Sequence, residues 1–294
     1  MDHIIDESGR LQVSRGPDTP LVFTACWGND SNFEALGLWL SALRRFGRYR
    51  GTVGVFTDRD ASRTLSYAEP ADRELVICRP FNGHPWIQRY QGWRDQTLQF
   101  SPILYLDTDI VVDADLEPTL RRVAAARGIC VTTEREIDRW AWTIAVRDIP
   151  IEHHPGDWFG LSLLKNDPEC LDELLPLINS GIIGCSDNKL FEDIGDIVRK
   201  LFLCHHHQEI GRVYGDQPFL NYVLTKIRVS DTESLLGTCQ FSGSVNDFPM
   251  KPRGFVHFCW TQGVDKVIQM RSYMENVKEF YKGGSVSCRF VRNS

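Results

Sequence analysis

The segment from Ile103 to Val112 contains the residues of this chain best suited to chemistry. Four apolar residues predict a buried strand, and Asp107 and Asp109 follow it with only Thr108 between them. Two carboxylates at a strand end repel each other unless a cation or a proton lies with them. Hard divalent cations take such oxygen ligands and complete their shell with water and substrate phosphates. The pattern therefore indicates a site for a metal ion and a diphosphate, with a simple turn or cap as the alternative.

Three later segments hold polar residues that the same site could use. An Asn-Ser-Gly triplet at 179–181 interrupts an apolar run, where small side chains admit a ligand to the backbone or Gly181 marks a β-bulge. Asp216 and Gln217 open a helix, either as substrate contacts or as an ordinary helix start capped by Asp216. His257 lies between bulky apolar residues, either as a ligand for a transition divalent ion or as a buried core histidine.

Short apolar runs alternate with amphipathic segments, which indicates how these residues are positioned. The first half of the chain predicts strands at 21–26, 53–56, 75–78 and 103–106, and helices at 32–46 and 86–100. The second half predicts strands at 129–132, 178–184 and 255–258, and helices at 187–204, 217–226 and 267–281. Strands that alternate with helices form a mostly parallel, Rossmann-like sheet covered on both faces. We therefore expect a single α/β domain with a decorated C-terminal half.

Composition narrows the classes of function. The 294 residues are 42% hydrophobic and 24% charged, which is typical of a globular protein. No stretch approaches the ~20 apolar residues that a membrane span needs. A net charge of −6 disfavours general nucleic-acid binding. The nine cysteines include no C-x-x-C pair, and the acidic N-terminus has no signal-peptide pattern, so we expect free thiols in a cytoplasmic protein.

The motifs together resemble glycosyltransferase family 8, the retaining nucleotide-sugar transferases of the glycogenin and bacterial galactosyltransferase group, which have the GT-A fold. Four family motifs occur in the family's order: Asp107-Thr108-Asp109 after Leu-Tyr-Leu, Asn179-Ser180-Gly181, Asp216-Gln217 with Asn221, and His257-Phe258. The chain departs from the family at two points. The first strand lacks the usual acidic residue and continues into Trp27, and the lysine expected after His257 comes three positions late, as Lys266.

The resemblance implies a role for each matched residue. The metal, usually Mn²⁺ with Mg²⁺ as the other option, would be bound by Asp107, Asp109 and His257. The nucleotide would lie against Thr24, Ala25, Cys26, Thr108 and Lys266. The donor sugar would contact Arg89, Glu134, Asn179, Ser180 and Gly181, with Arg94 as the alternative to Arg89. The catalytic pair would be Gln217, beside the anomeric carbon, and Asp216, at the sugar hydroxyls.

The resemblance also implies an activity and a division of the chain. A sugar would move from a nucleotide-sugar donor, usually a UDP-sugar, to a saccharide or lipid-linked acceptor, with retention of anomeric configuration. A loose arm at 1–20 would precede a GT-A domain at 21–266, with a nucleotide-binding half at 21–112 and an acceptor half at 113–266. An amphipathic helix and basic tail would follow at 267–294. From residue 271 the tail has five basic and two acidic residues, which suits peripheral contact with an anionic membrane.

Two other functions fit parts of the sequence. A phosphatase of the haloacid-dehalogenase type would use Asp107 as nucleophile and Asp109 as acid/base. Two predicted βα units precede the pair here, whereas that motif normally lies near the start of its fold, and His257 would have no role. A non-catalytic carbohydrate- or nucleotide-binding protein on the same fold would use aromatic stacking. The candidate residues for stacking are Trp86, Trp93, Trp140, Trp142, Trp158 and Trp260.

Overall fold

The computed structural model describes residues 19–81, 83–91, 100–135, 143–150, 157–241 and 251–283, with only the backbone of residue 91. Before residue 19 it describes the backbone of two short strands, β1 (Ile4–Ile5) and β2 (Leu11–Gln12), which pair antiparallel. The rest of the expected N-terminal arm and the basic tail after residue 283 lie outside the described residues. The same holds for four individual predictions, namely Trp93, Arg94, Trp140 and Trp142.

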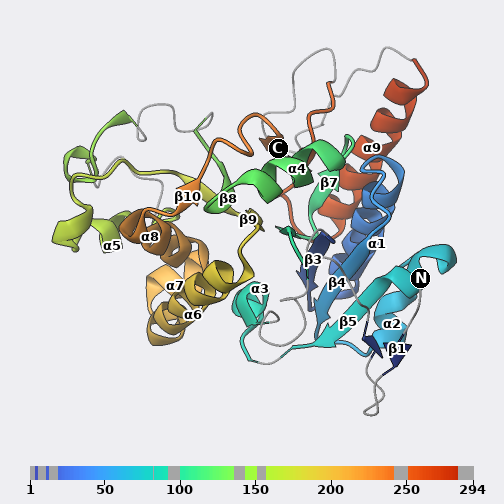
Figure 1. Cartoon of the computed structure of the whole chain (residues 1–294), viewed down its shortest axis with the longest axis horizontal. Coiled ribbons are helices and arrows are strands. Elements are labelled where there is room, and N and C mark those ends of the chain that lie inside the picture. The colour runs from blue at the N-terminus through green and yellow to red at the C-terminus, as the bar shows by residue number, and fades with distance from the viewer. Residues whose placement is uncertain are drawn as a thin grey trace.

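A seven-stranded sheet forms the centre of the molecule, in the order β10-β8-β9-β6-β3-β4-β5 (Figure 1). Its strands are β3 (Leu21–Cys26), β4 (Thr52–Thr57), β5 (Val76–Pro80), β6 (Ile103–Leu106), β8 (Ile129–Thr133), β9 (Ile178–Cys185) and β10 (Ser230–Asp231). All neighbours are parallel except β9, which runs antiparallel to both β6 and β8. The prediction of a mostly parallel α/β sheet is confirmed.

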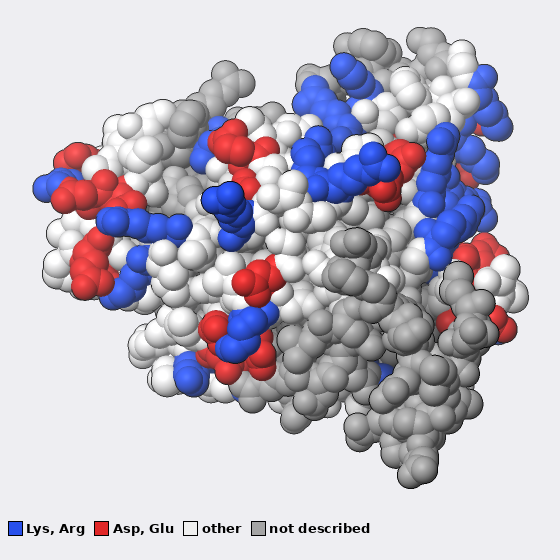
Figure 2. Space-filling view, in the orientation of Figure 1, with Lys and Arg blue, Asp and Glu red and all other residues white. Residues whose placement is uncertain are grey.

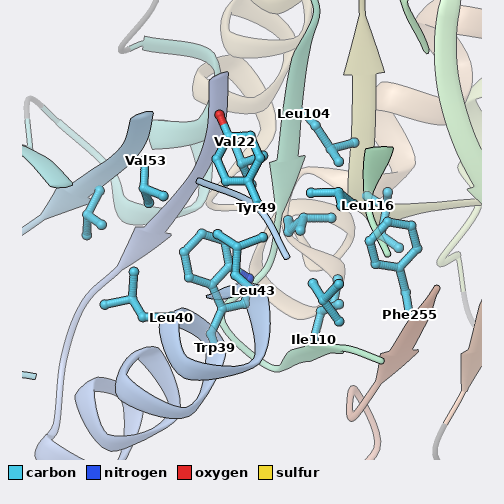
Figure 3. Packing of buried hydrophobic residues seen from close by; sticks show 14 of the residues in the cluster. Val22, Trp39, Leu40, Leu43, Tyr49, Val53, Leu104, Ile110, Leu116 and Phe255 are labelled. Carbon is cyan, nitrogen blue, oxygen red and sulfur yellow. The ribbon is translucent and has the colours of Figure 1, made fainter. Parts of the chain in front are cut away.

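Helices pack on both faces of this sheet, because alternate side chains of each strand point to opposite faces. One core contains Leu21 and Phe23 of β3 with the helices α3 (Gln88–Gln91), α6 (Asn188–His205) and α8 (Gln217–Ile227). The other core contains Val22 of β3 with α1 (Asp30–Arg45) and α4 (Glu117–Ala125). Figure 3 shows part of this second core, where Trp39 and Leu40 of α1 lie near the strands.

A second sheet has three strands in the order β11-β12-β7, and it contains the strand that ends at His257. Its strands are β7 (Ile110–Val112), β11 (Cys239–Phe241) and β12 (Phe255–His257), and the helix α9 (Gly263–Tyr281) packs against it and against α1. Buried Asp113 anchors α9, because the Tyr273 hydroxyl donates to its Oδ2 and the Gly254 amide to its Oδ1, both at 2.7 Å. The C-terminal helix is therefore fixed beside the strand that follows the two aspartates.

The remaining elements are short and connect the larger ones. They are α2 (Ala61–Leu65), α5 (Leu161–Lys165), α7 (Glu209–Tyr214) and the 3-10 turns η1 (Pro70–Leu75), η2 (Pro85–Ile87), η4 (Val146–Asp148) and η6 (Pro168–Cys170). Where one helix is predicted over 86–100, the structure has η2 followed by α3, and residues 92–99 lie outside the described part. The other predicted helices and strands match observed elements, with ends that differ by a few residues.

Charge is distributed unevenly over the surface despite the net acidity. Figure 2 shows Lys and Arg gathered over the region where Figure 1 shows α4, α9 and the end of α1. Exposed basic residues on or directly after these elements include Arg48, Arg121, Lys278 and Lys282. Within the described ranges, no helix is both long enough and apolar enough to cross a bilayer.

Candidate functional site

The predicted residues meet along one edge of the central sheet. Glu134 follows β8, Asp107 and Asp109 follow β6, and Ala25 lies near the end of β3. Because β9 is antiparallel to its neighbours, it brings its first residues, 179–181, to this same edge. Neighbouring strands in a sheet lie about 4.8 Å apart. The groups are therefore arranged in a row across four adjacent strands, with the aspartates between Glu134 and Ala25.

Asp107, Asp109 and His257 converge at the middle of this row. Each offers one ligand atom, and these atoms all lie within 4.8 Å of one another. The imidazole Nε2 is 3.2 Å from Oδ1 of Asp109 and 3.9 Å from Oδ2 of Asp107. His257 reaches this point because β12 pairs antiparallel with β7, which sets it opposite Ile110. The predicted cluster is therefore present, and it could hold a metal ion.

The chemistry of this cluster fits a divalent cation. In the described part of the chain, Oδ1 of Asp109 is buried with Nε2 of His257 3.2 Å away but without a well-aligned hydrogen bond, which is uncommon and costly for a buried carboxylate oxygen. Carboxylate oxygens and an imidazole nitrogen are common ligands of divalent metal ions. The space in front of the cluster depends on Gly181, where an added Cβ would lie 2.4 Å from Cε1 of His257 and 3.0 Å from Oδ2 of Asp107.

Two basic side chains contact the acidic groups. Lys266 lies in the first turn of α9 and its Nζ donates to Oδ2 of Asp109 at 2.7 Å. The guanidinium of Arg89 is 3.3 Å from Oδ1 of Asp107 and 3.5 Å from Oδ2 of Asp216. Lys266 therefore reaches the cluster from α9, and Arg89 faces it from α3, whereas its alternative Arg94 lies outside the described residues.

Burial and these neighbours shift the pKa values of the acids in opposite directions. Burial raises the pKa of Asp109, but His257 and Lys266 outweigh it and hold that pKa well below its usual range. Burial also raises the pKa of Asp216, and here Arg89 and the Tyr90 hydroxyl do not fully offset it. Asp109 is therefore firmly ionised, whereas Asp216 takes up a proton more readily than an ordinary aspartate.

A hydrogen-bonded network forms the end of the row on β8 and β9. Asn179 donates through Nδ2 to Oε1 of Glu134 at 2.7 Å, and its Oδ1 accepts from the Gly181 amide at 2.9 Å. Gln217 accepts at Oε1 from the Ser180 amide at 3.0 Å. This network fixes the orientation of amide and carboxylate groups that could contact the hydroxyls of a ligand.

The Asn-Ser-Gly triplet is both a β-bulge and part of the site. The pairing of β8 with β9 shifts register, because Val131 is opposite Ile183 whereas Thr132 is opposite Asn179. Residues 180–182 thus have no partner on β8. Such irregular pairing redirects side chains and is common next to functional sites. The triplet therefore lies in an irregular stretch of β9 and also lines the pocket described below.

Asp216 does not cap the helix α8 with its side chain, in contrast to the structural interpretation of the sequence. Its carboxylate instead accepts from the Tyr90 hydroxyl at 2.8 Å and faces Arg89. Asn221, one turn into the helix, pairs with both the amide and the carbonyl of Ile178, at 2.9 and 2.8 Å. Asn221 therefore fastens α8 to β9, and Asp216 is left to interact within the site.

These groups line one pocket of about 420 Å³. The predicted residues in its walls are Ala25, Arg89, Asp107, Thr108, Asp109, Glu134, Asn179, Ser180, Gly181, Asp216, Gln217, His257 and Lys266. Two predicted nucleotide contacts, Thr24 and Cys26, are absent from these walls. Both are buried, and Cys26 packs in the core beneath α1. Because side chains alternate along β3, Ala25 faces the pocket while its neighbours face away.

Aromatic side chains supply much of the remaining wall. Trp86, Trp158 and Trp260, which the sequence proposes for stacking, all line the pocket, and the ring of Trp158 lies 5.0 Å from that of Tyr214. Sequence reasoning did not select Trp27, which directly follows β3 and also lines the pocket. The only sequence signal for it was its place after a strand that runs parallel to the strand bearing the aspartates.

Two tyrosines in the site were also missed. Tyr90 donates to Asp216, and Tyr105 donates through its hydroxyl to Asp107 while its ring lies 4.7 Å from the guanidinium of Arg89. Both looked like ordinary apolar positions of a helix and a strand. Their hydroxyls orient the acids next to Arg89.

Arg89→Met is expected to lower the free energy of unfolding by about 3–5 kcal/mol, the cost of removing one partner from a buried ion pair. The change would leave Asp107 and Asp216 without their shared cation and the Ser180 carbonyl without a donor. Urea denaturation followed by circular dichroism measures it. Arg271→Met, at an exposed position on α9, should change stability by no more than about 0.5 kcal/mol. Equal effects of the two substitutions would refute the buried ion pair.

Comparison with known protein families finds no family that matches the chain, and comparison with curated proteins finds no significant match. The function must therefore be inferred from the site itself. That site combines a candidate cation site, two internal basic groups, a polar network at one end and aromatic walls.

Proposed function

We propose that the protein is a metal-dependent glycosyltransferase of the GT-A type, which transfers a sugar from a UDP-sugar to a hydroxyl acceptor with retention of anomeric configuration. The observation that carries this proposal is the order of groups along the sheet edge. A polar network lies on β8 and β9, the cluster Asp107, Asp109 and His257 follows β6, and Trp27 follows β3. A nucleotide sugar presents hydroxyls, a diphosphate and a planar base in the same order.

Each group of residues has a role in this proposal. Asp107, Asp109 and His257 would hold the cation, usually Mn²⁺, which when bound stabilises the charge that develops on the leaving diphosphate. Asn179 would hold sugar hydroxyls together with Glu134 and Asp216. Gln217 positions the sugar and does not attack it, because an amide is a poor nucleophile and its Oε1 already accepts from the Ser180 amide.

Trp27 and Asn32 are the proposed contacts for the base. The ring of Trp27 lies 6.0 Å from that of Phe81, and Nδ2 of Asn32 donates to the Trp27 carbonyl at 2.7 Å. These contacts hold an aromatic surface at the β3 end of the pocket. Stacking on such a surface accepts any base, and it would replace the contact that the family makes here with an acidic residue.

The phosphatase interpretation is disfavoured by the surroundings of the two aspartates. Asp107 would have to attack phosphorus, yet it is paired with Arg89 and accepts from the Tyr105 hydroxyl. Asp109 would have to donate a proton, yet His257 and Lys266 lower its pKa well below the usual range. A carboxyl that stays ionised is a poor general acid.

Release of UDP tests the proposal without knowledge of the acceptor. In the presence of Mn²⁺, we expect the purified protein to release UDP from one member of a panel of UDP-sugars, with water as a slow acceptor, and EDTA to stop this release. A coupled assay for UDP measures it. Hydrolysis of a generic phosphate monoester with Mg²⁺, without UDP release, would instead support a phosphatase. Metal-dependent binding of UDP with no release from any donor would support a binding protein.

A further inference from the structure

The ion pair between Lys266 and Asp109 lies inside the candidate cation site. Lys266 Nζ is 2.7 Å from Oδ2 of Asp109, and both side chains are largely buried, with 19% and 14% of their surface exposed. The other oxygen, Oδ1, faces His257 at 3.2 Å. One of the two metal-binding carboxylates is therefore already neutralised by a cation of the chain itself.

A divalent ion that approaches Asp109 meets this ammonium group at close range. Like charges a few ångströms apart interact strongly where water is largely excluded. The ion must either displace Lys266 from Oδ2 or bind beside a positive charge. Displacement leaves the lysine in the same partly buried pocket without a carboxylate partner. For an isolated divalent ion, both routes weaken binding.

A diphosphate removes this penalty. Its oxygens complete the shell of the divalent ion and also offer Lys266 a new anionic partner. The flexible four-carbon stem of lysine allows its ammonium group to move from a carboxylate to a phosphate. Arg89 is less free to move, because it also contacts Asp216 and the Ser180 carbonyl. Lys266 is therefore the basic group that can exchange partners.

We propose that the ammonium group of Lys266 supplies, beside Asp109, the positive charge that a metal ion would otherwise supply. Metal binding is then conditional on a diphosphate, so that the cation is held tightly only together with the nucleotide. This inference rests on the proposed function, because it assumes that the ligand carries a diphosphate. It predicts positive coupling between the two ligands. Coupling is reciprocal, so UDP raises the affinity for Mn²⁺ by the same factor by which Mn²⁺ raises the affinity for UDP.

Binding of Mn²⁺ to the full chain, without turnover, tests the inference. Titrations followed by the electron paramagnetic resonance signal of free Mn²⁺ would be done with the protein alone, with UDP and with inorganic pyrophosphate. Each would be compared with the same titration without protein, because both diphosphates themselves bind Mn²⁺. For the wild type we expect Mn²⁺ affinity to rise at least about 10-fold with UDP or pyrophosphate, within the usual range of coupling between ligands. Lys266→Met should bind Mn²⁺ alone several-fold more tightly than the wild type, and its coupling factor should fall. Lys266→Arg should keep the coupling.

Two controls separate this inference from the proposed function. Lys282→Met, at an exposed lysine directly after the same helix, should bind Mn²⁺ as the wild type does. If UDP-dependent Mn²⁺ binding is lost in Asp109→Asn but Lys266→Met matches the wild type in every titration, the inference is overturned and the metal–diphosphate site stands. If the wild type and Lys266→Met bind no Mn²⁺ under any condition, the proposed function and the inference both fail.

Discussion

Asp109→Asn is expected to reduce Mn²⁺-dependent release of UDP at least about 100-fold, the scale for loss of one preorganised electrostatic group. The amide keeps the shape of the side chain but removes its charge and one ligand oxygen. It also deprives His257 and Lys266 of the anion that both contact, at 3.2 and 2.7 Å. Initial rates of UDP release with the preferred UDP-sugar, at saturating Mn²⁺, measure the effect.

A neighbouring acid provides the matched control for this substitution. Asp265 is exposed, lies one residue before Lys266 and carries the same charge. Asp265→Asn should therefore retain nearly all of the activity, because exposed charges are well screened. Retention of more than half of the wild-type rate by Asp109→Asn would show that the cation is bound elsewhere.

The strands were predictable because this sheet is covered on both faces. Buried strands of this kind are continuous apolar runs, such as Leu21–Cys26 and Ile103–Leu106, which stand out in the sequence. The direction of β9 was not predictable from its run, because a strand buried on both faces has the same composition in either direction. That direction matters, since it brings Asn179 and Gly181 to the same edge as the aspartates.

Residue type located the acidic members of the candidate site but not their supports. Asp107 and Asp109 were selected because paired carboxylates at a strand end suggest a metal site. His257 was assigned to that site only by the family resemblance, because its place between apolar residues fits a core histidine equally well. Tyr90 and Tyr105 were missed, because their roles depend on which buried hydroxyl lies beside which acid. That information is in the packing of α3 against the sheet and not in the local pattern.

The position of Lys266 shows where motif spacing stops being informative. Eight residues separate it from His257, including a turn at 258–262 whose path no spacing rule defines. The structure begins α9 at Gly263, so the lysine lies in the first turn of a helix that Asp113 anchors. A shift of three positions in the sequence therefore still leaves the ammonium group at the site.

Gly181→Ala is expected to abolish detectable Mn²⁺ binding and to reduce UDP release at least about 100-fold, while the protein stays folded. The added methyl group would lie 2.4 Å from Cε1 of His257, 2.9 Å from Oδ1 of Asn179 and 3.0 Å from Oδ2 of Asp107. Carbon atoms do not approach so closely, so the imidazole or the strand must move. Movement of His257 would separate the ligand atoms that now lie within 4.8 Å of one another.

A change in the next residue distinguishes this steric effect from a loss of stability. Ile182 is fully buried on the same strand, and Ile182→Val should lower the free energy of unfolding by about 0.5–1.5 kcal/mol while Mn²⁺ binding and activity persist. Thermal unfolding of both variants, with and without Mn²⁺ and UDP, makes the comparison. Stabilisation by the two ligands should be seen for Ile182→Val and be lost in Gly181→Ala, because only a protein that binds a ligand is stabilised by it. Equal stabilisation of both variants would mean that Gly181 does not limit the space in front of the metal ligands.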